Sequence, residues 1–128
     1  GINSISIINE DVTTLNIEAE TYDRVLVDPP CSALGVLARN PDIAIREDLS
    51  NWEKLPQLQK SVLVKGLKAL KKGGRLLYSV CTFRKEETVD VVFFVIQEIG
   101  ALDKKMECLT MPNDVNMDGL YIAILEKK

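Results

Sequence analysis

Two short apolar runs, separated by an amphipathic segment, constrain the fold of this chain most. Residues 24–27 (Arg-Val-Leu-Val) form a continuous run that is typical of a strand buried on both faces. From Asn51 to about Lys71, apolar residues recur every three or four positions, which predicts one helix. Residues 76–80 predict a second buried strand. Strand, helix and strand in this order predict a right-handed crossover between neighbouring parallel strands.

Proline and glycine residues set the expected ends of these elements. Pro29 and Pro30 lack amide hydrogens and end the first strand. Pro56 is tolerated in the first turn of the helix, and the Gly73-Gly74 pair is expected to stop it.

Further elements are predicted on both sides of this unit. Ile5, Ile7 and Ile8 indicate an amino-terminal strand that leads to the acidic Asn9-Glu10-Asp11. Glu86 and Glu87 suit a helix start, followed by an apolar stripe that runs to Gly100; its members are Val89, Val92, Phe93 and Ile96. Residues 106–110 and 120–125 predict an antiparallel pair of strands. The chain is therefore expected to form one α/β layered domain over residues 1–128 with a mainly parallel sheet.

Composition limits the chemistry that such a domain can perform. The 128 residues carry a net charge of -3, so any contact with nucleic acid must be local rather than based on bulk charge. The chain has no histidine, which removes the usual general base and any Ser-His or Cys-His pair. Its three cysteines have no CxxC spacing, so we expect free thiols and no metal site.

The start of the sequence and its longest apolar runs bear on location. The first fifteen residues lack a basic region followed by an apolar core, so no signal peptide is expected. No apolar run approaches the roughly 18 residues that span a bilayer. We expect no membrane partner and an intracellular protein, cytoplasmic in a prokaryote and nucleolar or organellar in a eukaryote.

Acidic and thiol side chains follow the two central strands. Asp28 and Cys31 come after the first strand, and Cys81 comes directly after the second. Because binding sites in open α/β sheets form at the carboxyl ends of the strands, these side chains are expected to converge on one crevice. The alternative is that these residues have purely structural roles: Cys81 packs in the core, Asp28 caps its loop and Asp11 only solvates a strand end. Cys108, without polar neighbours in sequence, is expected to pack in the core.

Three segments of the sequence are distinctive: DPPCSALG at residues 28–35, LPQLQKSVLVKGLKALKKGGRLLYSVCTFRKEE at residues 55–87, and MDGLYIAILEKK at residues 117–128. Together they resemble the Fmu/Sun (Nop/NSUN-type) family of RNA cytosine-5 methyltransferases, which use S-adenosylmethionine (SAM). The resemblance covers nearly the whole chain in the family's order. It implies a Rossmann-like SAM-dependent methyltransferase fold with an antiparallel carboxyl-terminal strand.

The resemblance also implies roles for individual residues. Cys81 is the nucleophile that adds to C6 of cytosine, and Cys31 assists the elimination that releases product. Asp28 hydrogen-bonds N3 and the exocyclic amine of the base, which leaves any stack to reach the site. SAM is the implied cofactor and RNA, first of all ribosomal RNA, the implied partner. The remaining assignments are Asp11, Asp28 and Pro29 for the cofactor, and Pro30, Arg39 and Arg46 for the substrate.

The sequence departs from the family's pattern at three points. Val80 precedes the nucleophile where the family usually has threonine, and Thr88 stands where asparagine is common. The chain also starts at what resembles the family's third strand, so the first two strands and their glycine-rich SAM loop are absent. The predicted strand at Ile5 therefore lacks a neighbour. We expect a fragment of a longer enzyme, completed by an upstream segment, or a chain that dimerises or swaps strands.

Two other functions remain open at this point. An amino-methyltransferase could use Asp28, Pro29 and Pro30 to hold an exocyclic amine, although such enzymes have an aromatic residue at the position of Cys31. A non-catalytic RNA-binding remnant is compatible with the missing loop.

Overall fold

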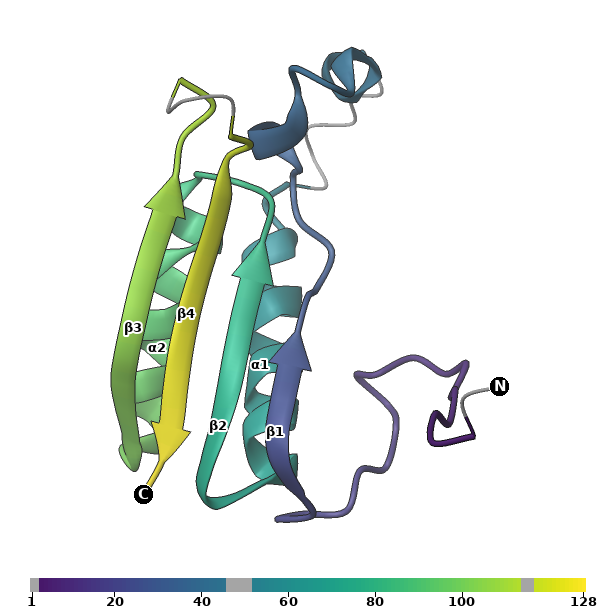
Figure 1. Cartoon of the computed structure of the whole chain (residues 1–128), viewed down its shortest axis with the longest axis vertical. Coiled ribbons are helices and arrows are strands. Elements are labelled where there is room, and N and C mark those ends of the chain that lie inside the picture. The colour runs from purple at the N-terminus through teal and green to yellow at the C-terminus, as the bar shows by residue number, and fades with distance from the viewer. Residues whose placement is uncertain (1–2, 46–51, 114–116) are drawn as a thin grey trace.

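The computed structural model describes residues 3–45, 52–113 and 117–128 (Figure 1). The helices and strands are β1 (Tyr22–Val27), α1 (Leu55–Ala69), β2 (Leu70–Val80), α2 (Val89–Ile99), β3 (Leu102–Thr110) and β4 (Leu120–Lys127). Short 3-10 helices are η1 (Leu34–Val36), η2 (Pro41–Ala44) and η4 (Lys85–Glu87).

The strands form a mixed sheet in the order β1-β2-β4-β3. β1 pairs with β2 in parallel, which confirms the neighbouring strands expected from the crossover through α1. β4 is antiparallel to both β2 and β3, as predicted for the carboxyl-terminal part. Both helices cover the same face of the sheet (Figure 1).

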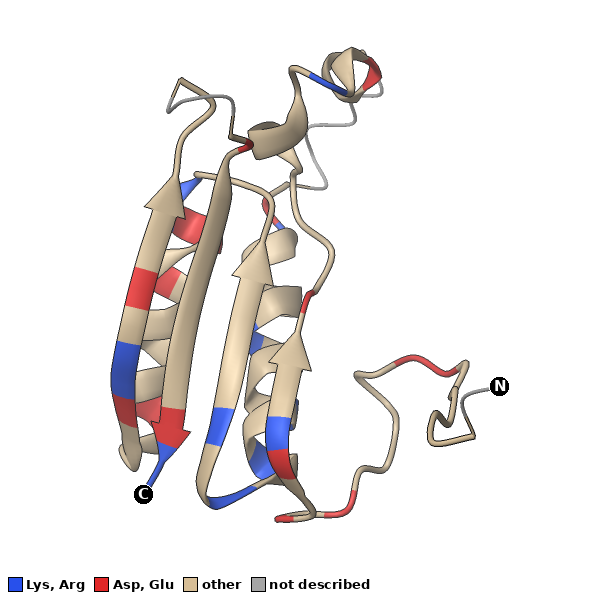
Figure 2. Ribbon diagram, in the orientation of Figure 1, with Lys and Arg blue, Asp and Glu red and all other residues tan. Residues whose placement is uncertain are grey.

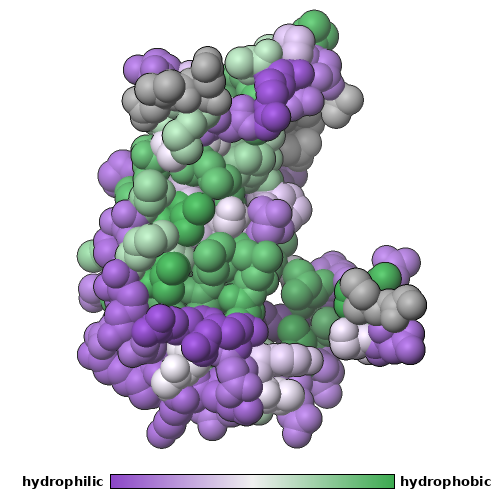
Figure 3. All heavy atoms as spheres, in the orientation of Figure 1, coloured by the Kyte–Doolittle hydropathy of each residue, from purple (hydrophilic) through white to green (hydrophobic). Residues whose placement is uncertain are grey.

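The core lies between that face and the two helices. Alternation along β2 turns Leu76, Tyr78 and Val80 toward the helices, and all three are fully buried. The other fully buried apolar side chains come mainly from α1, α2 and β4; they include Leu63, Leu67, Val91, Val95, Tyr121 and Leu125. The opposite face carries an apolar patch that neither helix covers (Figure 3).

The amino-terminal strand predicted at Ile5, Ile7 and Ile8 is wrong for this structure. No strand forms between residues 3 and 20, and these three side chains are exposed. The segment stands away from the outer edge of β1 (Figure 1). A strand requires backbone partners, and within the described residues nothing pairs with that edge of β1.

The expectation that the strand at residues 24–27 is buried on both faces is also wrong. Leu26 is 68% exposed, so β1 is not buried on both faces. The strand lies at the sheet edge, and Leu26 points to the uncovered face.

Helix α1 ends earlier than the glycines suggest. It stops at Ala69, and Leu70 is already extended and begins β2. Tyr22 pairs with Leu70 but Arg24 pairs with Arg75, so the intervening residues of β2 form a bulge. Gly73 has φ of +73° in this bulge, which explains why glycine stands there.

The apolar stripe of α2 and the burial of Cys108 also differ from expectation. Val92 and Ile96 pack inward as predicted, but Val89 and Phe93 are exposed and Val91 and Val95 take their place. Cys108 lies on the edge strand β3 and is exposed rather than in the core. Its strand is exposed along most of its length, and within the described residues no further strand pairs with its outer edge.

Candidate active site

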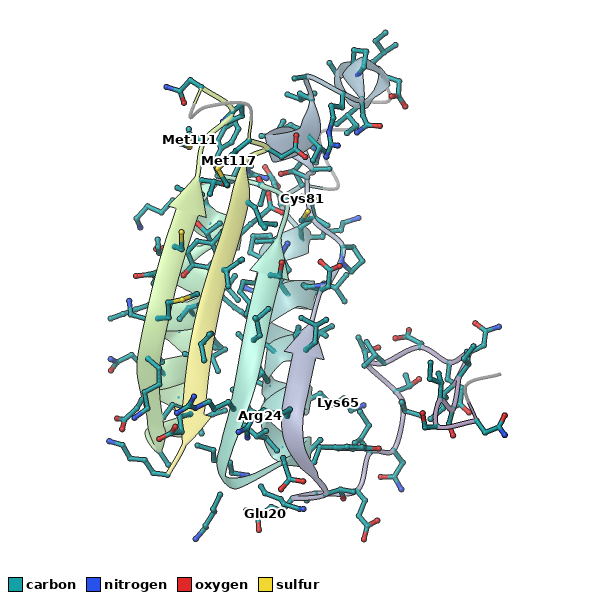
Figure 4. The ribbon with its side chains drawn as sticks, in the orientation of Figure 1. Glu20, Arg24, Lys65, Cys81, Met111 and Met117 are labelled. Carbon is teal, nitrogen blue, oxygen red and sulfur yellow. The ribbon has the colours of Figure 1, made fainter. Side chains whose placement is uncertain are left out.

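The carboxyl ends of β1 and β2 bring two thiols into contact. Cys31 follows β1 by four residues and Cys81 follows β2 directly, at the upper end of the sheet in Figure 4. The two Sγ atoms are 3.2 Å apart, and both side chains are half-buried. The convergence expected from parallel neighbouring strands is therefore present in the structure.

The environment of Cys31 keeps its thiol protonated. Burial raises its pKa to about 12, and the hydrogen bond with Cys81 acts in the same direction. At neutral pH Cys31 is therefore a neutral S–H group that is able to donate a hydrogen bond to the Sγ atom of Cys81.

The residues that directly follow the two cysteines belong to a buried polar cluster. The hydroxyls of Ser32 and Thr82, each next to one of the cysteines, are 2.8 Å apart. The Glu87 carboxylate accepts hydrogen bonds from the Ser32 amide at 2.9 Å, from Gln59 Nε2 at 2.9 Å and from Arg84 Nη1 at 3.1 Å. The loop after β1, the loop after β2 and helix α1 are thus joined through one carboxylate.

Backbone hydrogen bonds of two glycines join the loop after β1 to Cys81 and to the segment before β4. The Gly35 amide donates to the Cys81 carbonyl at 3.0 Å, and the Gly119 amide donates to the Gly35 carbonyl at 2.8 Å. A Cβ atom on Gly35 would lie 1.8 Å from the Gly119 oxygen. This close backbone approach requires glycine at position 35.

Asp28 and Pro29 border a cavity beside β1. The cavity has a volume of about 570 Å³ and is formed by the segment at residues 8–18, the edge of β1 and one side of α1. Most of its lining is aliphatic, and its polar or charged members are Asn16, Glu18, Tyr22, Arg24 and Asp28. Its volume lies in the range of small-molecule pockets, and its aliphatic surface with a few polar groups is compatible with part of a nucleoside cofactor such as SAM.

Asp11 is separate from this cavity lining. Its carboxylate accepts hydrogen bonds from the Thr13 amide and hydroxyl, both at 2.8 Å, and these bonds lower its pKa. Both contacts are local to its own turn. In the structure Asp11 is therefore a turn residue on the exposed amino-terminal segment.

The structure describes two of the three residues that were expected to contact the substrate. Pro30 is exposed, and its carbonyl accepts from Gln59 Nε2 at 3.0 Å. Arg39 is exposed and forms an ion pair with Asp118. Arg46 lies outside the described residues. Val80 is buried in the core, so the position at which the family usually has threonine does not point into the crevice.

Most charged side chains lie away from the thiols, although Asp28, Arg84 and Glu87 lie near them. Charged side chains gather toward the opposite end of the sheet, where β1 begins and β4 ends (Figure 2). Ion pairs there include Arg75–Glu126 and Lys128–Asp103. In the part of the chain that the structure describes, no group of three His, Cys, Asp or Glu side chains could hold a metal ion. Across the same residues, no helix has the length and apolar character needed to cross a membrane.

Sequence reasoning missed the cluster around Glu87. Glu86 and Glu87 both look like residues of a helix start, but Glu86 is 61% exposed while Glu87 is fully buried. A signal existed for Gln59, which occupies the inward stripe of α1 between Leu55 and Leu63 and is fully buried. A polar residue in an apolar stripe indicates a buried hydrogen-bonding partner.

The chain is similar in sequence to known RNA methyltransferases. The family model for the 16S rRNA methyltransferase RsmB/F matches residues 1–126. Ribosomal RNA small subunit methyltransferase B of Shewanella oneidensis is 35% identical over 122 residues, covering 86% of this chain and 28% of that protein. The tRNA (cytosine(49)-C(5))-methyltransferase of Pyrococcus abyssi is 37% identical over 92 residues, covering 72% of this chain and 29% of that protein.

A solved structure agrees with the sequence match. NSun6 from Pyrococcus horikoshii, crystallised with SFG, superposes with a TM-score of 0.76 and 25% identity, covering 98% of this chain and 35% of that one. The chain thus spans well under half the length of the relatives it matches. Its sheet and helices correspond to part of a Rossmann-like methyltransferase domain. By this match over nearly its whole length, the chain belongs to the 16S rRNA methyltransferase RsmB/F family, the Fmu/Sun family that its motifs resemble.

Proposed function

We propose that this chain carries the thiol site of a SAM-dependent RNA cytosine-5 methyltransferase that acts on ribosomal RNA. The observation that carries the proposal is the 3.2 Å contact between Cys31 Sγ and Cys81 Sγ at the ends of adjacent parallel strands. Cytosine C5 is a poor nucleophile until a thiolate has added to C6, so one thiol must attack the ring and later leave it. A second thiol in contact with the first is placed to assist its departure.

Each residue has a defined task in this reaction. The Cys81 thiolate adds to C6, which forms an S–C6 bond and places the electron pair at C5. SAM, when bound, supplies the methyl group that C5 takes up. Transfer of the C5 proton to water returns the C–H electron pair to the ring and breaks the S–C6 bond, so Cys81 leaves as a thiolate. Cys31 assists this elimination, and Asp28 hydrogen-bonds the base and stabilises the charge that develops during attack.

The raised pKa of Cys31 supports the assignment of different roles to the two thiols. Because Cys31 keeps its proton at neutral pH, it donates toward Cys81 and does not compete as a second nucleophile. Asp28 and Pro29, together with the aliphatic side of the cavity, are the residues that would hold the cofactor. The similarity to NSun6 solved with SFG and to proteins named rRNA and tRNA methyltransferases supports the same chemistry.

The complete gene product, incubated with unmodified small-subunit rRNA and SAM, tests the proposal. We expect 5-methylcytidine in the digested RNA, none with Cys81→Ala, and an unchanged yield with Cys108→Ser, because Cys108 lies exposed on β3. Methylation of an exocyclic amine would overturn the proposal in favour of an amino-methyltransferase. RNA binding without any methyl transfer would instead indicate a non-catalytic domain, and modification of tRNA alone would reject rRNA as the substrate.

A further inference from the structure

One fully buried carboxylate links the two loops that carry the thiols. The Glu87 side chain is 0% exposed and receives donors from both loops and from α1. We propose that Glu87 is a positioning residue that holds Cys31 against Cys81. The proposal deepens the proposed function, on which its catalytic meaning rests, whereas the geometry it explains does not depend on that function.

The Cys31 side of the contact is held through the neighbouring amide. Ser32 N donates to Glu87 Oε2 at 2.9 Å, which fixes the peptide unit that directly follows Cys31. Gln59 Nε2 donates to the same oxygen and also to the Pro30 carbonyl at 3.0 Å. The residues on both sides of Cys31 are therefore fixed by one carboxylate and one amide side chain.

The Cys81 side is held through Arg84. This guanidinium donates to Glu87 Oε1 at 3.1 Å and comes from the loop that follows Cys81. The main chain of Glu87 is fixed as well, because the buried Tyr78 hydroxyl donates to the Glu87 carbonyl at 2.8 Å. Tyr78 belongs to β2, the strand that ends at Cys81, so Glu87 is anchored to the strand that places the nucleophile.

Loss of the carboxylate would leave buried donors without acceptors. The Ser32 amide and the Gln59 side chain would then satisfy their hydrogen bonds by moving toward water, and the Cys31 loop would move with them. The remaining links, Ser32 Oγ to Thr82 Oγ1 and Gly35 N to Cys81 O, keep the loops together without fixing the peptide at Cys31. The expected result is a folded protein in which the two thiols meet less often.

The experiment measures the equilibrium between the Cys31–Cys81 disulfide and glutathione, which gives the effective concentration of one thiol at the other. Oxidised glutathione is reduced to two glutathione thiols while Cys31 and Cys81 are oxidised to one disulfide, so electrons and protons balance. An S–S bond is about 2.0 Å long, so thiols at 3.2 Å need only a small approach to form it. A Cys108→Ser background removes the third thiol, and mass spectrometry of peptides identifies the bridge.

In that background we compare the unchanged Glu87 with Glu87→Ala, Glu87→Gln and Glu86→Ala. Glu86 is the matched control because it is the adjacent acid. It is exposed, and its contact with Arg84 Nε is longer, at 3.8 Å. We expect Glu87→Ala to lower the effective concentration about tenfold or more, since it removes a charge-assisted acceptor shared by buried donors. Glu87→Gln keeps an acceptor oxygen and should rescue part of the loss, and Glu86→Ala should change nothing.

The possible outcomes distinguish a positioning role of Glu87 from a loss of protein stability, and they do not depend on the proposed methyltransferase function. A thermal melt of each variant shows that it is folded at the temperature of the measurement, and Glu87→Gln decides the matter if Glu87→Ala does not fold. An unchanged effective concentration in a folded Glu87 variant would overturn the proposal, as would failure of the parent protein to form the bridge. Neither RNA nor SAM enters this assay, so a loss of the proposed methylation would leave its result intact.

Discussion

Replacing Gly35 by alanine tests whether the loops at the thiol site are held by close backbone contact. A Cβ atom at this position would lie 1.8 Å from the Gly119 carbonyl oxygen, 2.5 Å from its carbonyl carbon and 2.8 Å from its Cα. All three are backbone atoms, so no side-chain rotation relieves the overlap. Since non-bonded heavy atoms pack at roughly 3.5 Å, the two loops must separate by more than about 1.5 Å.

This separation breaks specific hydrogen bonds. Gly35 N donates to Cys81 O at 3.0 Å, and Gly119 N donates to Gly35 O at 2.8 Å. Each bond contributes about 1 kcal/mol, and overpacking a tight site adds about 1–3 kcal/mol. We therefore expect Gly35→Ala to lower the free energy of unfolding by about 3–5 kcal/mol, a large share of the stability of a small domain.

The assay is urea unfolding followed by the fluorescence of the single tryptophan, Trp52. Gly66→Ala is the matched control, because its Cβ would meet only side-chain methyl groups, with Val27 Cγ2 at 2.9 Å and Leu76 Cδ1 at 3.0 Å. A gain in helix propensity of about 1 kcal/mol offsets part of that crowding. A Gly35→Ala protein as stable as the Gly66→Ala control would refute the reasoning.

Four further predictions concern the thiols and the core. The alkylation rate of Cys31 should keep rising up to a pH of about 12, and mass spectrometry should find no plateau near the ordinary thiol value of 9.0. Because the folded protein keeps a proton that the unfolded chain loses, stability contributed by Cys31 is complete below pH 9 and falls as the pH rises toward 12, which alkaline unfolding titrations measure. Tyr78→Phe should cost about 1–2 kcal/mol in urea unfolding, since it removes the donor to the buried Glu87 carbonyl; no cost would contradict that bond. Cys31→Ser should accumulate a covalent RNA–protein complex on denaturing gels, whereas rapid release would show that Cys31 does not assist elimination.

The placement of the two thiols was predictable because it depends on topology alone. A parallel crossover puts the carboxyl ends of β1 and β2 side by side, and the positions of Cys31 and Cys81 after their strands can be counted in the sequence. The antiparallel end of the sheet followed from two apolar segments around a turn-rich stretch.

Other features depend on contacts that local patterns do not contain. Glu86 and Glu87 are the same residue type, and only the three-dimensional arrangement of Ser32, Gln59 and Arg84 buries the second one. The strand expected at Ile5 has suitable residues, but strand formation needs a partner and local propensity cannot supply one. The early end of α1 arises because pairing of Leu70 with Tyr22 outweighs one more helical turn.

Covalent trapping tests the central claim most directly. RNA that carries 5-fluorocytidine at the modified position, incubated with SAM and the complete gene product, should form a stable adduct, because fluorine at C5 blocks the elimination that normally releases the enzyme. Peptide mapping should locate the bond at Cys81, and Cys81→Ala should abolish it. An adduct at Cys31 or Cys108 instead, or methyl transfer to an amine without any adduct, would contradict the assignment of Cys81 as the nucleophile.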